Sequence, residues 1–346
     1  MKPAAELRIA FFDTKPYDRE SFEAQNKAFG FHLKFFPSHL TEETVSLCQG
    51  YDAVCIFVND LVTKGIVEAL AALKVPLLAL RSAGFNNIDL KAATGKIKIT
   101  RVPSYSPHGV AEHAVALMLS LNRKTHRAYY RTRDNNFSLH GLVGFDMNGK
   151  TAGIVGTGQI GRIVCEILKG FGMTVIAYDP FASQEWADAK GVELVDLGSL
   201  YERSDIISLH CPLTPQNIHM INRGTIELMK PDVMIINTGR GKLIRSEDLL
   251  EALREEKVGS AGLDVYEEET DYFFEDYSSH IMKDDVLARL ISFPNVLVTS
   301  HQAFFTVEAL ANIANTTLEN IRSFFYDGKI LNEVCAAPGK DGRCSE

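Results

Sequence analysis

The first part of the chain alternates between short apolar blocks and amphipathic stretches. Apolar runs of strand length are separated by helical patterns that have one apolar face. The runs lie at residues 7–13, 32–37, 52–58, 75–80 and 97–102, and the helical patterns at about 17–30, 41–48 and 62–73. Strands that alternate with helices in this way predict a parallel sheet with helices on both faces. This region therefore has the pattern and size of a flavodoxin-like α/β domain.

The second part of the chain repeats the alternation and has a long helix before it. Strands are expected at 152–155, 173–178, 205–209, 233–237, 258–265 and 295–299, and a last helix at about 306–326. The long helix is expected over about 108–131, after the segment 103–107, which proline stiffens at both ends. That segment is a good candidate for a crossing between domains. The whole pattern predicts an α/β chain with two doubly wound parallel sheets.

The stretch 151–180 has the order of a dinucleotide-binding unit. A short apolar strand leads into Gly156, Gly158 and Gly161 in the spacing G-x-G-x-x-G, and a helix, a second strand and Asp179 follow. The first glycine permits a tight turn, the second lets a pyrophosphate approach the backbone, and the third lets the helix pack closely. The N-terminus of the helix offers N–H groups to the phosphates. Asp179 can accept hydrogen bonds from ribose hydroxyls and would repel a 2′-phosphate, so the motif favours NAD over NADP.

Length and composition fit two soluble domains. The chain has 346 residues, 46% of them hydrophobic, and a formal net charge of −8, which argues against nucleic acid as a main partner. No apolar run reaches the length of a membrane-spanning helix, and the N-terminal residues lack the apolar core of a signal peptide. We therefore expect a cytoplasmic protein without a membrane partner. The cysteines show no C-x-x-C spacing, so we expect reduced thiols and neither a disulfide framework nor a metal site. They are Cys48, Cys55, Cys165, Cys211, Cys335 and Cys344.

Polar side chains follow several of the strands expected in the second part of the chain. They include His210, Thr238, Arg240, Asp264 and His301. Ligands of an open α/β sheet bind beyond the carboxyl ends of the strands, so these residues would converge on the dinucleotide groove. Hydride transfer to a carbonyl needs a cation that binds the substrate and a general acid that protonates its oxygen. Arg240 suits the first task because a guanidinium stays charged, and His301 suits the second because imidazole titrates near neutrality.

Several of these assignments remain open at the level of residue pattern. An arginine between two glycines is usually a surface charge, and a histidine after a strand is usually a hydrogen-bonded turn residue. A carboxylate beside an imidazole favours its charged form and orients the ring. Glu267, Glu268 and Glu269 all lie near a strand end, and spacing alone selects none of them. The loop 81–89 is either a turn closed by small and Asx residues or a loop whose backbone N–H groups bind a small anion.

Motifs in both parts of the chain carry a likeness to a known family. The glycine motif with Asp179 and the stretches NTGRG (237–241), GLDVYE (262–267) and TSHQAF (299–304) resemble those of the D-isomer-specific 2-hydroxyacid dehydrogenases. The likeness covers nearly the whole chain, and it is strongest to the fermentative D-lactate dehydrogenases of bacteria. The stretches that carry this closer likeness are 53–60, 81–90, 101–114, 136–161, 208–217 and 271–278.

The resemblance implies a domain arrangement and a reaction. A Rossmann NAD-binding domain, residues 104–301, would be inserted in a flavodoxin-like substrate domain made of residues 1–103 and 302–346. The chain would reduce pyruvate to D-lactate with NADH. The cation would bind and polarise pyruvate, and the histidine, charged and paired with a glutamate, would donate the proton. The residues implied in these roles are Arg240, Glu269 and His301.

The resemblance also implies the contacts of substrate and cofactor. Backbone N–H groups of Ala83 and Gly84 would hold the substrate carboxylate, and Tyr105 would lean on it. The residues implied in NAD binding are Gly156, Gly158, Gln159, Ile160, Gly161, Asp179, Cys211, Pro212, Asn217, Thr238, Gly239 and Asp264. We expect no metal ion. The resemblance suggests a homo-oligomer, a dimer or a tetramer, with the long helix at 108–131 as a contact.

Two alternatives to pyruvate reduction remain. The first is a related dehydrogenase for a bulkier 2-keto acid, such as 2-ketoisocaproate. Phe304 and Phe305 favour a closed, apolar pocket end that suits a methyl group instead. The second is a non-enzymatic, NAD-sensing interaction protein, because the resembling family includes transcriptional corepressors that keep the same arginine, glutamate and histidine.

Overall fold

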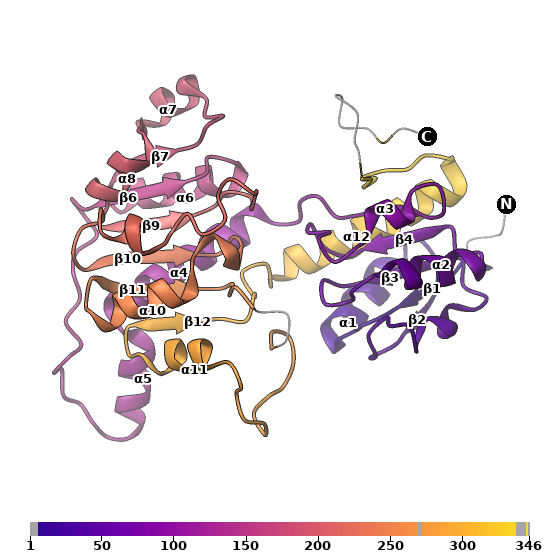
Figure 1. The fold of residues 1–346 in the computed structure, drawn as a ribbon, viewed down its shortest axis with the longest axis horizontal. Coiled ribbons are helices and arrows are strands. Elements are labelled where there is room, and N and C mark those ends of the chain that lie inside the picture. Colours follow the sequence, from indigo (N-terminus) through magenta and orange to yellow (C-terminus); the bar gives the residue numbers. More distant parts are fainter. Residues whose placement is uncertain (1–5, 269–271, 337–343, 345–346) are drawn as a thin grey trace. The chain divides into compact units, whose positions relative to one another are not determined.

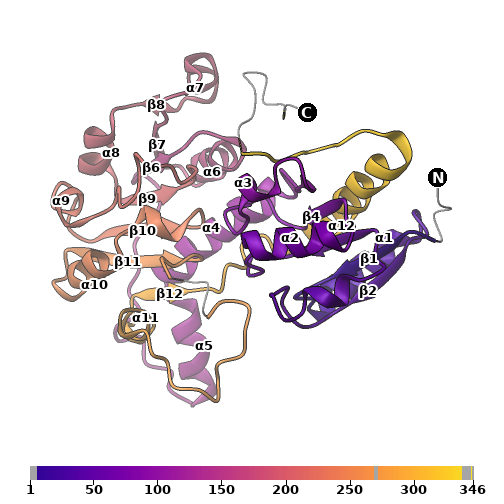
Figure 2. The ribbon, with the colours of Figure 1, turned by 45° about the vertical axis from the view of Figure 1, so that its right-hand side comes forward.

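The computed structural model describes residues 6–268, 272–336 and 344. The chain divides into two compact units, which we call unit 1 (Met1–Ser106 with Phe305–Glu346) and unit 2 (Pro107–Phe304). Figures 1 and 2 show that each unit is a sheet with helices packed on it, which confirms the expected α/β fold class. Within the described ranges, no helix combines the length and the apolar character needed to span a bilayer.

Unit 1 is built on a five-stranded parallel sheet with the strand order β2-β1-β3-β4-β5. Its strands are β1 (Arg8–Phe11), β2 (His32–Phe35), β3 (Ala53–Ile56), β4 (Leu77–Leu80) and β5 (Lys98–Thr100). Its helices are α1 (Pro16–Asn26), α2 (Lys64–Ala72), α3 (Leu90–Ala93) and α12 (Val307–Arg322), with a 3-10 turn at Val45–Cys48. The strand order is that of flavodoxin-like domains. β3 and β4 are buried along their whole length because helices cover the sheet, so they read as unbroken apolar runs.

Unit 2 is built on a seven-stranded parallel sheet with the order β12-β11-β10-β9-β6-β7-β8. Its strands are β6 (Thr151–Val155), β7 (Thr174–Tyr178), β8 (Glu193–Leu194), β9 (Ile206–Leu209), β10 (Val233–Asn237), β11 (Val258–Leu263) and β12 (Val296–Val298). Its helices are α4 (Pro107–Arg123), α5 (Thr125–Arg133), α6 (Gln159–Gly170), α7 (Gln184–Lys190), α8 (Leu197–Arg203), α9 (Arg223–Ile226), α10 (Ser246–Arg254) and α11 (Asp285–Ser292). The chain reverses its direction of winding between β6 and β9, which is the switch point of a Rossmann fold.

Successive side chains of the central strands of unit 2 enter two different cores. Ile154 of β6 and Ile236 of β10 pack in the core under α4 and α6, and their neighbours Val155 and Ile235 pack in the core on the opposite face. Both faces of these strands are therefore apolar, as expected for a parallel sheet covered by helices. The sheet edge at the carboxyl ends of the strands is left to carry polar residues.

We expected one long helix over 108–131, and that prediction is wrong in one respect, because the structure has two helices there. α4 ends at Arg123, and Lys124 has a left-handed backbone with φ of 50° before α5 begins. The break between the helices is held by a later segment of the chain, which folds back onto the junction. The Asn122 side chain donates to the Phe145 carbonyl and accepts from the Phe145 amide, each at 2.8 Å, and the Lys124 ammonium donates to the Val143 carbonyl.

The expectation that all cysteines are reduced is also wrong. A disulfide joins Cys335 to Cys344, nine positions later in the sequence, with Cα atoms 5.8 Å apart. This Cα separation lies within the range that disulfides span. The missing C-x-x-C spacing excluded only the tightest loops, and the wider loop closed here has no short sequence signature. Cys48, Cys55, Cys165 and Cys211 are free thiols.

Candidate active site

The glycine turn between β6 and α6 explains the spacing of its three glycines. Gly156 has a φ of 97°, and a Cβ there would lie 2.7 Å from the His210 backbone. A Cβ on Gly161 would lie 1.9 Å from the Gly156 carbonyl oxygen, so helix and turn touch at that point. A Cβ on Gly158 would meet nothing within 4 Å. The turn is therefore packed from behind and open above Gly158, where the N-terminus of α6 begins with Gln159 and Ile160.

Asp179 follows β7 and faces this turn. Its Oδ2 accepts from the Thr157 amide at 2.7 Å and from the Thr157 hydroxyl at 3.0 Å, and its Oδ1 accepts from the Phe181 amide at 2.8 Å. Burial would raise the pKa of Asp179, but these hydrogen bonds and the nearby Arg162 guanidinium hold the pKa below its usual range. The carboxylate is thus ionised and suited to accept hydrogen bonds from ribose hydroxyls.

β9, which adjoins β6, and β10, which adjoins β9, end in residues that line the same edge of the sheet. After β9, Asn217 closes its own turn by accepting from the Thr214 amide and donating to the Pro212 carbonyl, each at 2.7 Å, and its amide nitrogen lies 3.7 Å from the Cys211 sulfur. After β10, Thr238 is 7% exposed, and its hydroxyl has no hydrogen-bond partner in the part of the chain that the structure describes. A buried hydroxyl without a protein partner is available to a ligand or to water. Together with the open turn at Gly158, it fits a dinucleotide.

Arg240 lies in a turn whose shape is set by Asn237, the last residue of β10. The Asn237 side chain accepts from the Gly239 amide at 3.0 Å and donates to the Arg240 carbonyl at 2.9 Å. The Arg240 guanidinium donates to the Gly239 carbonyl at 2.7 Å and is partly buried. On the other side, a Cβ on Gly241 would lie 2.0 Å from the Tyr266 carbonyl oxygen. The arginine therefore stands on a turn held from two sides.

His301 follows β12 and has a left-handed backbone with φ of 51°. Its amide donates to the Asp264 carbonyl at 2.7 Å, and its ring centroid lies 5.9 Å from that of Phe274. Since β10, β11 and β12 are adjacent in the sheet, Arg240, Asp264 and His301 follow neighbouring strands. The geometry brings the predicted cation and the predicted acid to one edge of unit 2.

Asp264, which we expected to line the cofactor groove, directs its carboxylate to the His301 turn. It accepts from the Thr299 hydroxyl at 2.6 Å, the Gln302 amide at 2.8 Å and the Ala303 amide at 2.9 Å. Burial would raise the pKa of Asp264, but hydrogen bonds from the His113 and Thr299 side chains and from the Ala303 amide hold it below its usual range. Sequence reasoning gave His113 no role, although it lies in the AEHA stretch, and its Nε2 is 3.1 Å from the Thr299 hydroxyl.

The structure distinguishes in part between the three glutamates that sequence spacing could not tell apart. Glu267 uses both carboxylate oxygens inside unit 2, one with His219 and the other with the Ser246 amide. Glu268 is exposed. Glu269, the glutamate that the resemblance selects, lies outside the described residues. His210, another histidine at a strand end, is unsuited to donate a proton near neutrality, because burial lowers its pKa to about 4.

Ala83, Gly84 and Tyr105 belong to unit 1. The Arg101 guanidinium donates to the Ala83 carbonyl at 2.8 Å, and the Ser82 hydroxyl donates to the Gly84 carbonyl at 2.9 Å. Among the described residues, the amides of Ala83 and Gly84 have no acceptor. The loop thus holds its carbonyls and leaves two amides available, which fits the anion-binding explanation of this loop.

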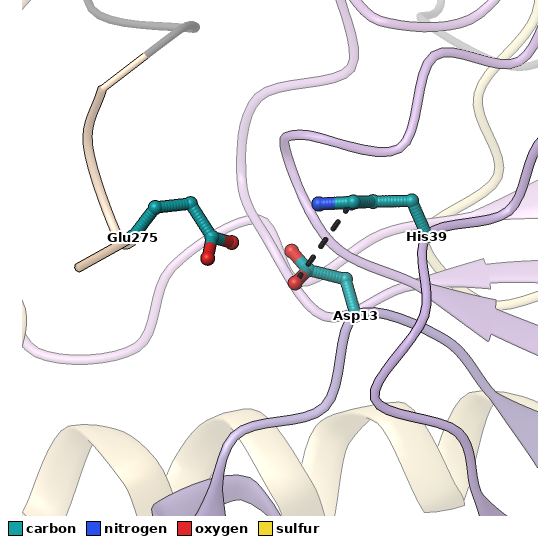
Figure 3. Close-up of side chains that lie close together, drawn as sticks. All are labelled: Asp13, His39 and Glu275. Carbon is teal, nitrogen blue, oxygen red and sulfur yellow. Dashed lines mark ion pairs between the residues drawn. The ribbon is translucent and has the colours of Figure 1, made fainter. Parts of the chain in front are cut away.

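A second group of titratable side chains lies at the carboxyl edge of the sheet in unit 1 (Figure 3). Asp13 is fully buried, and its Oδ1 lies 3.9 Å from the His39 Nδ1 and 3.0 Å from the Lys15 ammonium. Burial raises the pKa of Asp13. Glu275, drawn in the same view, belongs to unit 2. Within unit 1, Asp13 and His39 would supply two ligands, whereas a structural zinc site has about four.

Comparisons with known proteins agree with the motifs. Residues 115–303 match the family model "D-isomer specific 2-hydroxyacid dehydrogenase, NAD binding domain". The chain is 53% identical over 329 residues to the D-lactate dehydrogenase of Escherichia coli (strain K12), with 95% of this chain and 100% of the relative covered.

Solved structures support the same relationship. The apo-structure of D-lactate dehydrogenase from Escherichia coli matches with a TM-score of 0.87 and 50% identity, over 94% of this chain and 99% of that chain. The structure of D-2-hydroxyisocaproate dehydrogenase matches with a TM-score of 0.84 and 31% identity, over 94% of this chain and 99% of that chain. The chain belongs to the D-isomer-specific 2-hydroxyacid dehydrogenase family and has its NAD-binding domain.

Proposed function

We propose that the protein is an NAD-dependent D-lactate dehydrogenase that reduces pyruvate in fermentation. The observation that carries the proposal is the position of Arg240 and His301 at the ends of β10 and β12, on the sheet edge that also bears the glycine turn. The 53% identity to the Escherichia coli D-lactate dehydrogenase supports pyruvate as the substrate. We infer a cytoplasmic enzyme.

The chemistry divides between cofactor and protein. Bound NADH supplies the hydride that reduces the carbonyl carbon. Arg240 binds the substrate and polarises its carbonyl as a fixed cation. His301 donates a proton to the carbonyl oxygen as charge develops there. Glu269 pairs with the imidazolium and keeps it charged until the proton is transferred.

The two units take different roles in this proposal. Unit 2, whose bounds each lie three residues after those of the expected range 104–301, binds NAD, and unit 1 binds the substrate carboxylate. The free amides of Ala83 and Gly84 hold the pyruvate carboxylate, and Tyr105 contacts it. The Tyr105 carbonyl accepts a hydrogen bond of 2.8 Å from the Asn312 side chain of α12, which fixes the backbone of this segment inside unit 1.

A bulkier 2-keto acid is the second candidate substrate. The similarity to D-2-hydroxyisocaproate dehydrogenase is lower, at 31% identity, than that to the D-lactate dehydrogenase of Escherichia coli. This difference in identity favours a methyl group over an isobutyl group.

We also infer a homo-oligomer, with the contact placed at the second part of the expected helix range 108–131 and the residues that follow it. The apolar stripe of α4 is buried in the core of unit 2 and has little surface to offer a partner. α5 and the residues after it instead expose large apolar side chains, and exposed patches of this kind are typical of subunit contacts. They are Tyr129, Tyr130, Phe137, Leu139 and Val143. Light scattering after size exclusion should find a dimer or a tetramer, and a monomer would contradict this inference.

The proposed reaction is tested by NADH oxidation with a panel of 2-keto acids. We expect the highest kcat/KM with pyruvate, a much lower value with 2-ketoisocaproate, and D-lactate as the product on a chiral column. A preference for 2-ketoisocaproate would replace the substrate assignment. NADH binding without turnover of any 2-keto acid would leave the NAD-sensing interaction protein as the better account.

A further inference from the structure

His219 and Glu267 form a hydrogen-bonded pair beside the Arg240 turn. The His219 Nε2 lies 2.5 Å from the Glu267 Oε1, and because a carboxylate oxygen accepts, the imidazole N–H donates. The side chains are 35% and 17% exposed. The second carboxylate oxygen accepts from the Ser246 amide at 3.2 Å, at the start of α10. Both oxygens of the Glu267 carboxylate are therefore hydrogen-bonded within unit 2. Glu267 follows β11, as the site residue Asp264 does.

The backbone of His219 is tied to the arginine turn. Its amide donates to the Lys242 carbonyl at 2.8 Å, two residues after Arg240, and the Asn222 side chain donates to the His219 carbonyl at 2.8 Å. His219 has a left-handed backbone with φ of 55°. A β-carbon disfavours this conformation, so it persists only where the surroundings enforce it, and such residues gather at functional sites.

The backbone of Glu267 touches the same turn from the other side. A Cβ on Gly241 would lie 2.6 Å from the Glu267 amide nitrogen, so only glycine permits this approach. Glu267 stands two positions before Glu269. The loops after β9 and β11 therefore meet at the His219–Glu267 hydrogen bond, and both contact the loop after β10. Each of these loops carries residues to which the family resemblance gives a role.

We propose that His219 and Glu267 are positioning residues that fix the Arg240 turn against the segment leading to Glu269. The pair does not touch the reacting atoms. It sets the position of the Arg240 guanidinium and the point where the segment with Glu269 begins. The proposal rests on the proposed function, because it assigns the pair to the substrate side of that reaction. Displacement of a catalytic group by about 1 Å can lower the rate on the order of 100-fold, so a bond between loops can affect turnover strongly.

The test compares His219→Ala with His219→Gln in the full-length protein. The alanine variant loses the bond, whereas the amide nitrogen of glutamine can take the place of Nε2 and donate to Glu267. We expect His219→Ala to lower kcat and to weaken the binding of oxamate, a pyruvate analogue, by roughly 10- to 100-fold. We expect the Kd of NADH, measured by fluorescence without substrate, to stay unchanged. We expect His219→Gln to retain most of the activity and of the oxamate affinity.

A second pair of variants distinguishes the loss of the His219–Glu267 hydrogen bond from the loss of a negative charge. Glu267→Gln keeps the side-chain size but cannot accept from both His219 and Ser246, so we expect it to behave like His219→Ala. Glu247→Gln removes the same charge from a side chain that is 70% exposed beside Ser246, and we expect wild-type kinetics. If His219→Ala fails to fold, Glu267→Gln carries the test with the same readouts.

Either of two results would overturn the proposal. One is an unchanged kcat and oxamate affinity in both His219→Ala and Glu267→Gln. The other is a loss of NADH affinity that matches the loss of kcat, which would place the pair on the cofactor side. Failure of the proposed function is seen separately, as a wild-type protein that binds NADH but turns over no 2-keto acid.

Discussion

The carbonyl oxygen of Asp264 accepts a 2.7 Å hydrogen bond from the backbone amide of His301. The carboxylate of the same aspartate accepts from the amides of the next two residues, Gln302 and Ala303. One buried residue at the end of β11 thus shapes the whole turn after β12. The left-handed backbone of His301 is held by these contacts, and the position of the proposed acid follows from the neighbouring strand.

We expect Asp264→Asn to destabilise unit 2, because an amide in place of the carboxylate leaves a buried donor unpaired. Such a loss costs about 1–3 kcal/mol. Urea denaturation of the full-length protein, followed by circular dichroism, measures the change. Asp134→Asn, at an exposed position after α5, is the control. Equal stability of the two variants would show that the Asp264 carboxylate does not hold the turn.

The same substitution should change how stability depends on pH. Folding lowers the pKa of Asp264, so the unfolded chain takes up this proton at a higher pH than the folded chain. The stabilisation is complete above the ordinary aspartate pKa of about 4 and is lost as the pH falls below it. We expect the wild-type protein to lose more stability than Asp264→Asn between roughly pH 5 and pH 3. Parallel curves would contradict the lowered pKa.

The glycine turn offers two alanine substitutions with opposite effects. A methyl group at Gly161 would overlap the Gly156 carbonyl, so Gly161→Ala should destabilise the fold by about 1–3 kcal/mol or more. Gly158→Ala has open space around it, so stability should change little while NADH affinity falls, because the methyl group blocks the pyrophosphate. Thermal melts and NADH titrations of the two variants check this. Unchanged NADH affinity in Gly158→Ala would argue against the proposed pyrophosphate position.

Asp179 should determine the preference between NADH and NADPH. Its ionised carboxylate faces the glycine turn, where it would accept hydrogen bonds from ribose hydroxyls and repel a 2′-phosphate. We expect Asp179→Ser to lower the ratio of NADH to NADPH affinity at least roughly tenfold, since close like charges cost several kcal/mol. Titration of both cofactors by fluorescence measures the ratio. The assignment fails if Asp179→Ser discriminates as strongly as the wild-type protein.

Glu269→Gln should alter the pH profile of pyruvate reduction. A carboxylate beside an imidazolium favours the charged form, so without it the loss of activity with rising pH should begin at a lower pH. The profile of kcat/KM for pyruvate gives the comparison. Glu268→Gln is the matched variant one position earlier and should keep the wild-type profile. Identical profiles in all three proteins would remove Glu269 from the proton-donating pair.

Much of the fold followed from local pattern. Both parallel sheets were predictable because strands buried on both faces read as apolar runs, and the glycine turn because its backbone geometry demands specific residues. The predicted cation and acid could be placed at strand ends because a parallel sheet brings those ends to one edge. Arg240 and His301 both lie where this rule puts them.

The remainder depends on contacts that no local pattern contains. The helix break at Lys124 is enforced by Asn122 binding the Phe145 backbone, more than twenty residues later in the chain. Spacing could not tell that Glu267 turns toward His219, because three consecutive glutamates share the same pattern. The role of Asp264 differed from the predicted contact with the cofactor because its side chain points to a turn formed 35 or more positions later in the chain.

The most direct test of the proposed function is the His301→Gln variant. Pyruvate reduction should fall by roughly 10²- to 10⁴-fold, the range for loss of a general acid. The Kd of NADH, measured by fluorescence titration, should stay near the wild-type value, because the glycine turn and Asp179 are untouched. Full activity in this variant would contradict the assignment of His301 as the acid and with it the proposed mechanism.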